Sequence, residues 1–280
     1  MLNLKRYKFT PNMNSIYVLA VLVAVIGLIA GIRAVTRYDR SLRGAKYAAE
    51  PVFLPAYQVR ACAAPDGTPT ADYFKVYPPQ PNDKVVYLTF DDGPSKNVTP
   101  QILDILKQYN VKATFFVIGQ NAEKNPALIA RMAKEGHAVA SHSYSHNYDF
   151  LYGDAESFRS ELNATRNVLT SIVGEKGFSD IFRFPGGAFG DQHTELKAVL
   201  IEENVPYVNW NCLTGDAETK APISADLITR AKRSARNARS SSLVLLMHDA
   251  GAKQATADAL PAIIEHFRGE GYRFSALKRY

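Results

Sequence analysis

The feature that most constrains this chain is the alternation, from Val85 onward, of short apolar runs with longer amphipathic stretches. Short apolar or β-branched runs predict buried strands, and stretches with helical periodicity between them predict helices. The predicted strands are residues 85–90, 113–118, 137–141, 181–184, 207–210 and 243–247, and YRFSAL closes the pattern. The predicted helices are PQILDILKQY, with Thr99 as its cap, PALIARMAKEG, and residues near 155–173, 193–203, 224–238 and 256–268.

Six or seven such units predict an α/β fold, with a parallel sheet either closed into a barrel or left open and doubly wound. In both architectures the carboxyl ends of the strands form the face on which sites are built. Polar residues follow the predicted strands at these ends: Asp91, Asp92, His142, His146, Arg183, Asn211, Asp216, His248 and Asp249. We therefore expect an active site on this face.

The spacing of two histidines indicates a metal site. His142 and His146 lie four residues apart in HSYSH, which would place both rings on one side of a helical turn. One carboxylate from the Asp91–Asp92 pair would complete three protein ligands and leave open positions. This set suits Zn²⁺, and Co²⁺, Mn²⁺ or Fe²⁺ fit the same ligands. The other aspartate would then be a general base toward water, and His248 an acid.

Each of these groups also has a purely structural interpretation. An Asp-Asp-Gly-Pro string is more often a turn than a site, and a histidine pair is about as often an accident of a helix surface. A histidine such as His248 is usually a satisfied core residue, and Arg183 alone is most often a surface or ion-paired side chain. The order of these groups on successive strands is what favours a site.

The net charge of +6 does not indicate a nucleic-acid partner, because it is concentrated at one end. Residues 1–46 hold eight Lys and Arg and one acid, Asp39, so residues 47–280 carry a net charge of −1. Basic side chains beside an apolar run favour contact with anionic lipid head groups or surface polyanions. No feature of the sequence indicates an obligate protein partner.

Residues 16–32 form an uncharged apolar run of seventeen residues, about 25 Å long as a helix, which predicts a single transmembrane helix that serves as an anchor. Arginines follow the run where a cleaved signal peptide would have small residues, so we expect no cleavage. These flanking charges, taken alone, favour a cytoplasmic main domain. A Pro- and Ala-rich stretch, residues 47–83, then predicts a stalk. The two cysteines, Cys62 and Cys212, have no metal-type spacing, and a bridge between them stays open.

The motifs between residues 84 and 280 together resemble the polysaccharide deacetylase family, the carbohydrate esterases with a NodB-homology domain. The resemblance rests on TFDDGP, HSYSH, RFPGG at 183–187, the stretch from Asn209 to Asp216 that includes Trp210, and LVLLMH. It implies a distorted (β/α) barrel of about seven strand–helix units. It also implies a hydrolase that acts on the linear amide C–N bond of N-acetyl groups.

The resemblance assigns roles to single residues. Asp92, His142 and His146 would hold the metal, Asp91 would be the base and His248 the acid. Arg183 would orient the base, and Asp216 would raise the basicity of His248. Substrate contacts are implied for the backbone of Gly186, for Trp210, and for Leu246 in the acetyl pocket. The chain departs from the family at Leu213, where an acid is usual, at Ala217, where a tryptophan is usual, and near Gly186, where many members have an aromatic residue.

An anchored catalytic domain would reach the envelope of its own cell, so the expected substrate is N-acetylglucosamine in peptidoglycan and the expected location is extracytoplasmic. N-acetylmuramic acid, a surface poly-N-acetylglucosamine, chitin oligomers and an O-acetyl ester on xylan remain alternatives. Two further alternatives are a catalytically inactive barrel that binds wall glycan and a hydrolase that faces the cytoplasm.

Overall fold

A computed structural model of the chain describes residues 60–63, 69–75, 84–238 and 240–277. The predicted anchor at residues 16–32 lies outside these ranges. Within them, no helix has both the length and the apolar character that crossing a membrane requires. Two antiparallel strands, β1 (Arg60–Ala63) and β2 (Pro69–Lys75), lie within the stretch predicted to be an irregular stalk.

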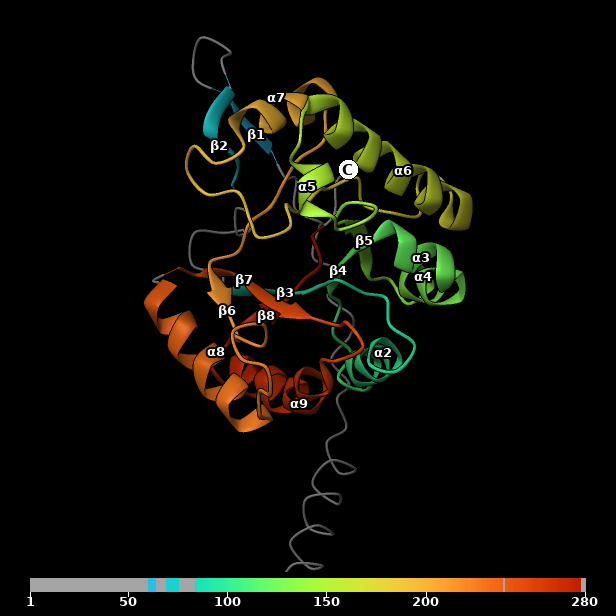
Figure 1. Cartoon of the computed structure of the whole chain (residues 1–280). Coiled ribbons are helices and arrows are strands. Elements are labelled where there is room, and N and C mark those ends of the chain that lie inside the picture. The colour runs from blue at the N-terminus through green and yellow to red at the C-terminus, as the bar shows by residue number, and fades with distance from the viewer. Residues whose placement is uncertain (1–59, 64–68, 76–83, 239, 278–280) are drawn as a thin grey trace, which may run out of the picture. The chain divides into compact units, whose positions relative to one another are not determined.

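Six strands form one parallel sheet, which confirms the predicted α/β class. Five follow the order β5-β4-β3-β7-β6, and the sixth, β8, pairs with the start of β3. Their bounds are β3 (Val85–Asp91), β4 (Thr114–Val117), β5 (Ala138–Ser141), β6 (Cys212–Leu213), β7 (Ser242–His248) and β8 (Arg273–Phe274). β3 and β7 run side by side over their full length at the centre of Figure 1, with Asp91 opposite His248.

Alternation along β3 decides which side chains reach the site. Val86, Leu88 and Phe90 belong to the large core cluster that the helices cover, whereas Val85 and Tyr87 belong to a smaller cluster on the opposite side of the strand. Because successive strand side chains point to opposite faces, Asp91 falls on the same side as Val85 and Tyr87. The strand pattern therefore delivers one carboxylate, Asp91, to the end of the inner face.

Two predicted strands, 181–184 and 207–210, are reduced to isolated parallel bridges from Ser141 to Phe182 and from Phe182 to Tyr207. Prolines limit both segments, since Pro185 and Pro206 have no N–H to donate to a ladder. The bridges still continue the sheet beyond β5, and the chain then leads into β6 beside β7. This arrangement is consistent with a distorted barrel.

Helices connect the strands largely where the sequence predicts them. They are α2 (Thr99–Gln108), α3 (Gly119–Lys124), α4 (Pro126–Lys134), α5 (Tyr148–Leu151), α6 (Ala155–Val173), α7 (Thr194–Glu202), α8 (Ser224–Ala238) and α9 (Gln254–Gly269). Figure 1 shows α2, α8 and α9 along one side of β3 and β7. The prediction that Thr99 caps α2 is wrong: Val98 holds the cap position, and the Thr99 hydroxyl donates instead to Asp249 Oδ2 at 2.6 Å.

Candidate active site

Asp91 is held by a buried arginine. Arg183 Nη1 donates to Asp91 Oδ1 at 2.9 Å and to Thr89 Oγ1 at 2.7 Å, and its Nε donates to the Val208 carbonyl at 3.1 Å. The guanidinium also lies over the Phe116 ring, 4.0 Å from its centroid. Burial lowers the pKa of Arg183, and the charge of Asp91 opposes that effect. Because these contacts hold the Arg183 guanidinium in place, the guanidinium in turn orients the Asp91 carboxylate.

The two histidines of HSYSH lie on a loop, so the predicted helical turn is wrong. Positive φ angles at Ser143 (65°) and His146 (57°) reverse the chain locally. Backbone N–H groups of Tyr144 and Ser145 donate to the buried Glu161 carboxylate at 2.7 and 2.8 Å. These turns, rather than helical periodicity, bring the rings of His142 and His146 to 5.3 Å between centroids.

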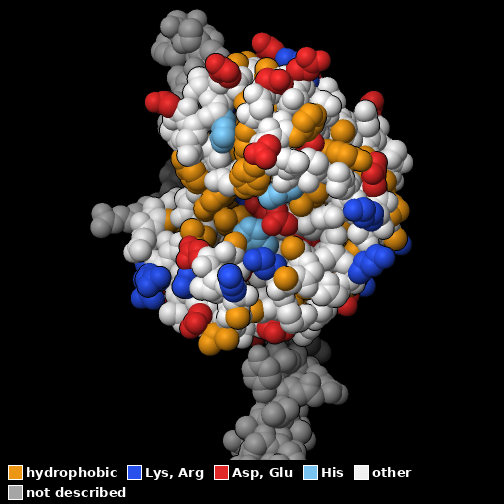
Figure 2. Space-filling model, viewed as in Figure 1, with side chains coloured by type: hydrophobic (Ala, Val, Ile, Leu, Met, Phe, Trp, Pro, Cys, Tyr) orange, Lys and Arg blue, Asp and Glu red, His pale blue; other side chains and the backbone are white. Residues whose placement is uncertain are grey.

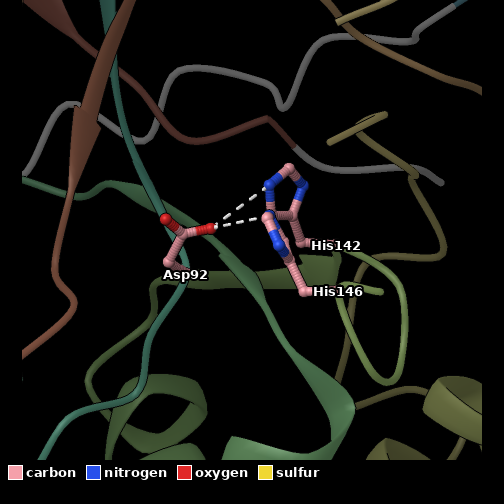
Figure 3. A group of neighbouring side chains, drawn as sticks. All are labelled: Asp92, His142 and His146. Carbon is pink, nitrogen blue, oxygen red and sulfur yellow. Dashed lines mark ion pairs between the residues drawn. The ribbon is translucent and has the colours of Figure 1, made fainter. Parts of the chain in front are cut away.

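Asp92 completes a group of three possible metal ligands with the two histidines (Figure 3). Its Oδ1 lies 3.5 Å from His142 Nε2 and 3.3 Å from His146 Nε2, and one candidate ligand atom from each residue lies within 4.8 Å of the others. A φ of 73° at Asp92 turns its side chain away from the direction taken by Asp91. The neighbouring aspartates therefore separate, one toward Arg183 and one toward the histidines.

The electrostatics of Asp92 and His142 match what metal ligands require, whereas His146 would release a proton when an ion binds. Burial raises the pKa of Asp92, but His146 in contact and the charges of His142 and His248 outweigh it, so its pKa lies well below the usual range. Burial lowers the pKa of His142 despite the nearby aspartates, while contact with Asp92 raises that of His146. His142 Nδ1 lies 2.8 Å from the Arg183 carbonyl, an acceptor, so this nitrogen carries the proton and Nε2 keeps its lone pair.

His248 is paired with Asp216. Its Nδ1 donates to Asp216 Oδ1 at 2.8 Å, and its backbone N–H donates to Oδ2 at 2.8 Å. Thr256 Oγ1 also donates to Oδ2, at 2.8 Å. Burial lowers the pKa of His248, but Asp216 more than offsets it, so the pKa is raised. Conversely, burial raises the pKa of Asp216, and its bonds to His248 and Thr256 bring it below the ordinary value.

The structure also places the residues with implied substrate contacts. Gly186 is exposed and has a φ of 76°, in the turn that follows Arg183. Trp210 is partly buried beside Arg183, with 5.8 Å from the guanidinium carbon to the ring centroid. Leu246 is partly buried on β7, two residues before His248, and therefore on the same side of the strand.

Two of the polar residues at predicted strand ends serve other purposes. Asn211 bonds the backbone of β7, accepting from Val244 N at 2.8 Å and donating to Ser242 O at 2.9 Å. Asp249 is fully buried, and burial raises its pKa to about 7. Its carboxylate packs against Gly93 so closely that a Cβ there would lie 2.2 Å from Oδ2. Only glycine fits beneath the Asp91–Asp92 turn.

Sequence reasoning missed two residues. Glu161 holds the loop that carries His142 and His146, and the Asn209 side-chain amide hydrogen-bonds to the backbone of Ala188. Asn209 Oδ1 accepts from Ala188 N at 3.0 Å, and its Nδ2 donates to Ala188 O at 2.7 Å. Glu161 is an acid on the mostly apolar buried face of α6, which is the signal that the sequence offers for it. For Asn209, the sequence offers no signal beyond its place in the stretch from Asn209 to Asp216.

Known proteins resemble this chain in the region that carries these site residues. Residues 79–200 match the family model described as polysaccharide deacetylase. The chain is 36% identical over 201 residues to a peptidoglycan-N-acetylglucosamine deacetylase of Bacillus cereus, covering 70% of this chain and 68% of the relative. The chain belongs to the polysaccharide deacetylase family. Its reaction is hydrolysis of the amide bond of N-acetyl groups on a polysaccharide.

Solved structures agree with this assignment of the deacetylase. A CE4 esterase of Streptococcus mutans superposes with a TM-score of 0.65 at 36% identity, covering 70% of this chain and 87% of that one. The catalytic domain of a peptidoglycan N-acetylglucosamine deacetylase from Eubacterium rectale gives 0.63 at 32% identity, covering 72% and 94%. The resemblance inferred from the motifs is thus confirmed at the level of the family.

Proposed function

We propose that the deacetylase removes acetyl groups from N-acetylglucosamine units of cell-envelope peptidoglycan. The observation that carries this proposal is the placement of three groups together: the trio Asp92, His142 and His146, the Asp91–Arg183 pair, and the Asp216–His248 pair. Curated relatives named peptidoglycan-N-acetylglucosamine deacetylases supply the substrate class.

A divalent metal ion fits the trio. Asp92 Oδ1 is buried and accepts no hydrogen bond from the described residues, an arrangement that is costly unless a cation compensates it. Two imidazoles and one carboxylate suit Zn²⁺, with Co²⁺, Mn²⁺ and Fe²⁺ as alternatives. When bound there, the ion would polarise the acetamide carbonyl and make a water easier to deprotonate. An anionic Asp92 and a largely neutral His142 already have the charges that binding needs, and His146, whose pKa Asp92 raises, would give up a proton to the ion.

Asp91 is the proposed general base. Its Oδ2 lies 3.9 Å from His142 Nε2, so this carboxylate borders the trio while Oδ1 stays on Arg183. Asp91 therefore takes a proton from the attacking water, and Arg183 holds the carboxylate in one orientation during the transfer. The same arginine keeps Asp91 from swinging inward to become a fourth ligand.

His248 is the proposed general acid. Because Nδ1 donates to Asp216, Nε2 is the nitrogen that faces away from Asp216 and carries the transferable proton. The raised pKa of His248 favours the protonated ring near neutral pH. Nε2 gives its proton to the leaving amine, and Asp216 stabilises the ring in the orientation this transfer requires.

The remaining roles concern the acetyl group and the oxyanion. The backbone N–H near Gly186 donates to the oxyanion that forms when water attacks the carbonyl, and one such donor contributes about 3 kcal/mol. Leu246 lines the pocket for the acetyl methyl group, and Trp210 contacts the substrate beside Arg183. N-acetylmuramic acid, poly-N-acetylglucosamine and chitin oligomers offer the same acetamide and stay as alternative substrates.

We further propose that residues 16–32 anchor the enzyme in the cell membrane with the catalytic domain outside the cytoplasm. The support is the uncharged run itself together with a substrate that lies in the envelope. A topology reporter fused after Tyr280 tests this orientation. A signal from a reporter that works only outside the cytoplasm is expected, and a signal from a cytoplasm-only reporter would contradict it.

The proposed substrate is tested by acetate release from purified peptidoglycan, chitin oligomers and acetylated xylan, using the full chain. The fastest release is expected from peptidoglycan, and release by the Asp91→Asn variant should be at least about a hundredfold slower on every substrate. Release confined to xylan would instead favour an ester hydrolase. Binding of wall glycan without any acetate release would favour an inactive binding barrel.

A further inference from the structure

Exposed aromatic rings gather at one turn of the site. Four large hydrophobic side chains are exposed among the described residues, Tyr148, Phe150, Phe189 and Ile223. Two of them border the Gly186–Gly187 turn. A Cβ on Gly186 would lie 3.2 Å from the Tyr148 hydroxyl, and one on Gly187 would lie 2.7 Å from the Phe189 ring. Gly186, the exposed residue of this turn, therefore presents backbone without a side chain between two half-exposed rings, whereas Gly187 is buried.

This turn is held rigidly from both sides. Tyr152, four residues after Tyr148, donates its hydroxyl to the Pro185 carbonyl at 2.5 Å. On the other side, the Asn209 amide makes its two hydrogen bonds to the backbone of Ala188. Phe189 packs edge to face against Trp210, with 5.2 Å between ring centroids. Side chains exposed on a turn fixed in this way are preorganised for a ligand.

Tyr148 also reaches the proposed metal site. Its ring lies 5.4 Å from that of His146 and nearly perpendicular to it. Its hydroxyl forms no hydrogen bond with the described residues. Tyr148 is 47% exposed, and its hydroxyl borders the exposed Gly186. Figure 2 shows acidic and histidine side chains together near the middle of the face in view, with hydrophobic side chains around them. The Tyr148 hydroxyl is thus a free donor at the edge of the reacting centre.

We propose that Tyr148 and Phe189 are sugar-binding residues that select a chain of at least two N-acetylated hexosamine units. The bare turn lets a pyranose ring approach closely, and the Tyr148 hydroxyl donates to the sugar that is deacetylated. The Phe189 ring packs on the apolar face of the neighbouring sugar, as aromatic rings do with flat C–H surfaces. This inference rests on the proposed function, since it assigns the substrate contacts of the same site.

The test is steady-state kinetics of the full chain on N-acetylglucosamine tetramer and dimer. Phe189→Ala should raise KM about tenfold for both oligomers with kcat nearly unchanged, because both carry a neighbouring sugar, and it should not change hydrolysis of the N-acetylglucosamine monomer. Tyr148→Phe should lower kcat/KM about three- to tenfold on both oligomers, the loss of one neutral hydrogen bond. Phe150→Ala is the matched control, since Phe150 is equally exposed on the same short helix and should change neither value.

Binding supplies a second readout that is independent of turnover. In an Asp91→Asn background, calorimetry with the tetramer should show about tenfold weaker binding for Phe189→Ala and unchanged binding for Phe150→Ala. Wild-type kinetics in both Phe189→Ala and Tyr148→Phe, together with unchanged tetramer affinity for Phe189→Ala, would overturn the sugar-binding role of these residues. The proposed function would stay intact if the wild type is active. A wild type that releases no acetate from either oligomer or from peptidoglycan would overturn both.

Discussion

The ends of β3 and β7 lie side by side, with Asp91 opposite His248 in the register, yet the proposed mechanism gives them opposite roles in proton transfer. At the end of β3, a buried carboxylate is paired with Arg183, a cation that does not titrate in the working range. At the end of β7, the carboxylate of Asp216 is the partner that holds the ring, and the titratable ring of His248 is the group proposed to transfer a proton. In the proposed mechanism, the same kind of ion pair therefore supports a base at one strand end and an acid at the other.

A third aspartate shows what the pairing contributes. Asp249 follows His248 directly and is as buried as Asp91, but no cation pairs with it among the described residues. Its pKa is raised to about 7, whereas the partner His248 brings that of Asp216 below the ordinary value. Burial alone does not make a reactive carboxylate here; the partner decides whether it is ionised.

The largest effect on turnover is expected from His142→Ala. This change removes one proposed metal ligand and the ring that Arg183 O orients, so activity should fall to background and bound metal should be lost. Elemental analysis of the purified chain measures the metal, and His266→Ala on α9 is the control histidine. Full activity without metal would contradict the separate role given to Asp92, His142 and His146 as metal ligands.

Asp91→Asn should lower kcat by roughly 10²–10⁴-fold while metal content stays at the wild-type value. The amide keeps the size of the side chain but cannot take a proton from water. Single-turnover acetate release together with metal analysis checks both parts. Loss of metal in this variant would instead make Asp91 a ligand, and the two adjacent aspartates would no longer have separate roles.

Asp216→Asn should lower kcat on the order of 10²-fold and move the alkaline limb of the pH–rate profile to lower pH. Asp216 holds the pKa of His248 above its ordinary value, and a protonated acid is lost as pH rises through that pKa. Without the carboxylate, His248 loses its proton at lower pH. An unchanged alkaline limb would mean that another group provides the acid.

Asp249→Asn should have the smallest effect on turnover and a distinct effect on stability. The folded carboxyl titrates near pH 7 and the unfolded one near 3.8, so the folded chain binds more protons between these values. Wild-type stability should therefore decline as pH rises through this window, by at most about 4 kcal/mol, and the variant should lack this decline. Urea unfolding at pH 5 and pH 8 measures it. Parallel pH profiles for the two proteins would show that Asp249 is already ionised.

The sequence predicted the elements with regular periodicity and the polar residues at their ends. Asp91, His248 and Arg183 could be assigned to one end of the sheet because each ends or follows an apolar run that reads as a strand, and the carboxyl ends of parallel strands share one edge. The loop at HSYSH could not be predicted, since a spacing of four fits a helix as well as two positive-φ turns closed by the distant Glu161. The bridges at Phe182 and Tyr207 also depend on prolines whose effect is seen only in the assembled sheet.

The most direct test of the division between metal trio, base and acid is acetate release from peptidoglycan by the full chain after chelation and after Zn²⁺ is restored, with metal content measured at each step. Release should fall to background with the chelator and return with Zn²⁺. Asp91→Asn loaded with Zn²⁺ should bind the ion and stay at least about a hundredfold slower than the wild type. Undiminished release by a metal-free chain, or recovery of activity in the loaded variant, would contradict this account.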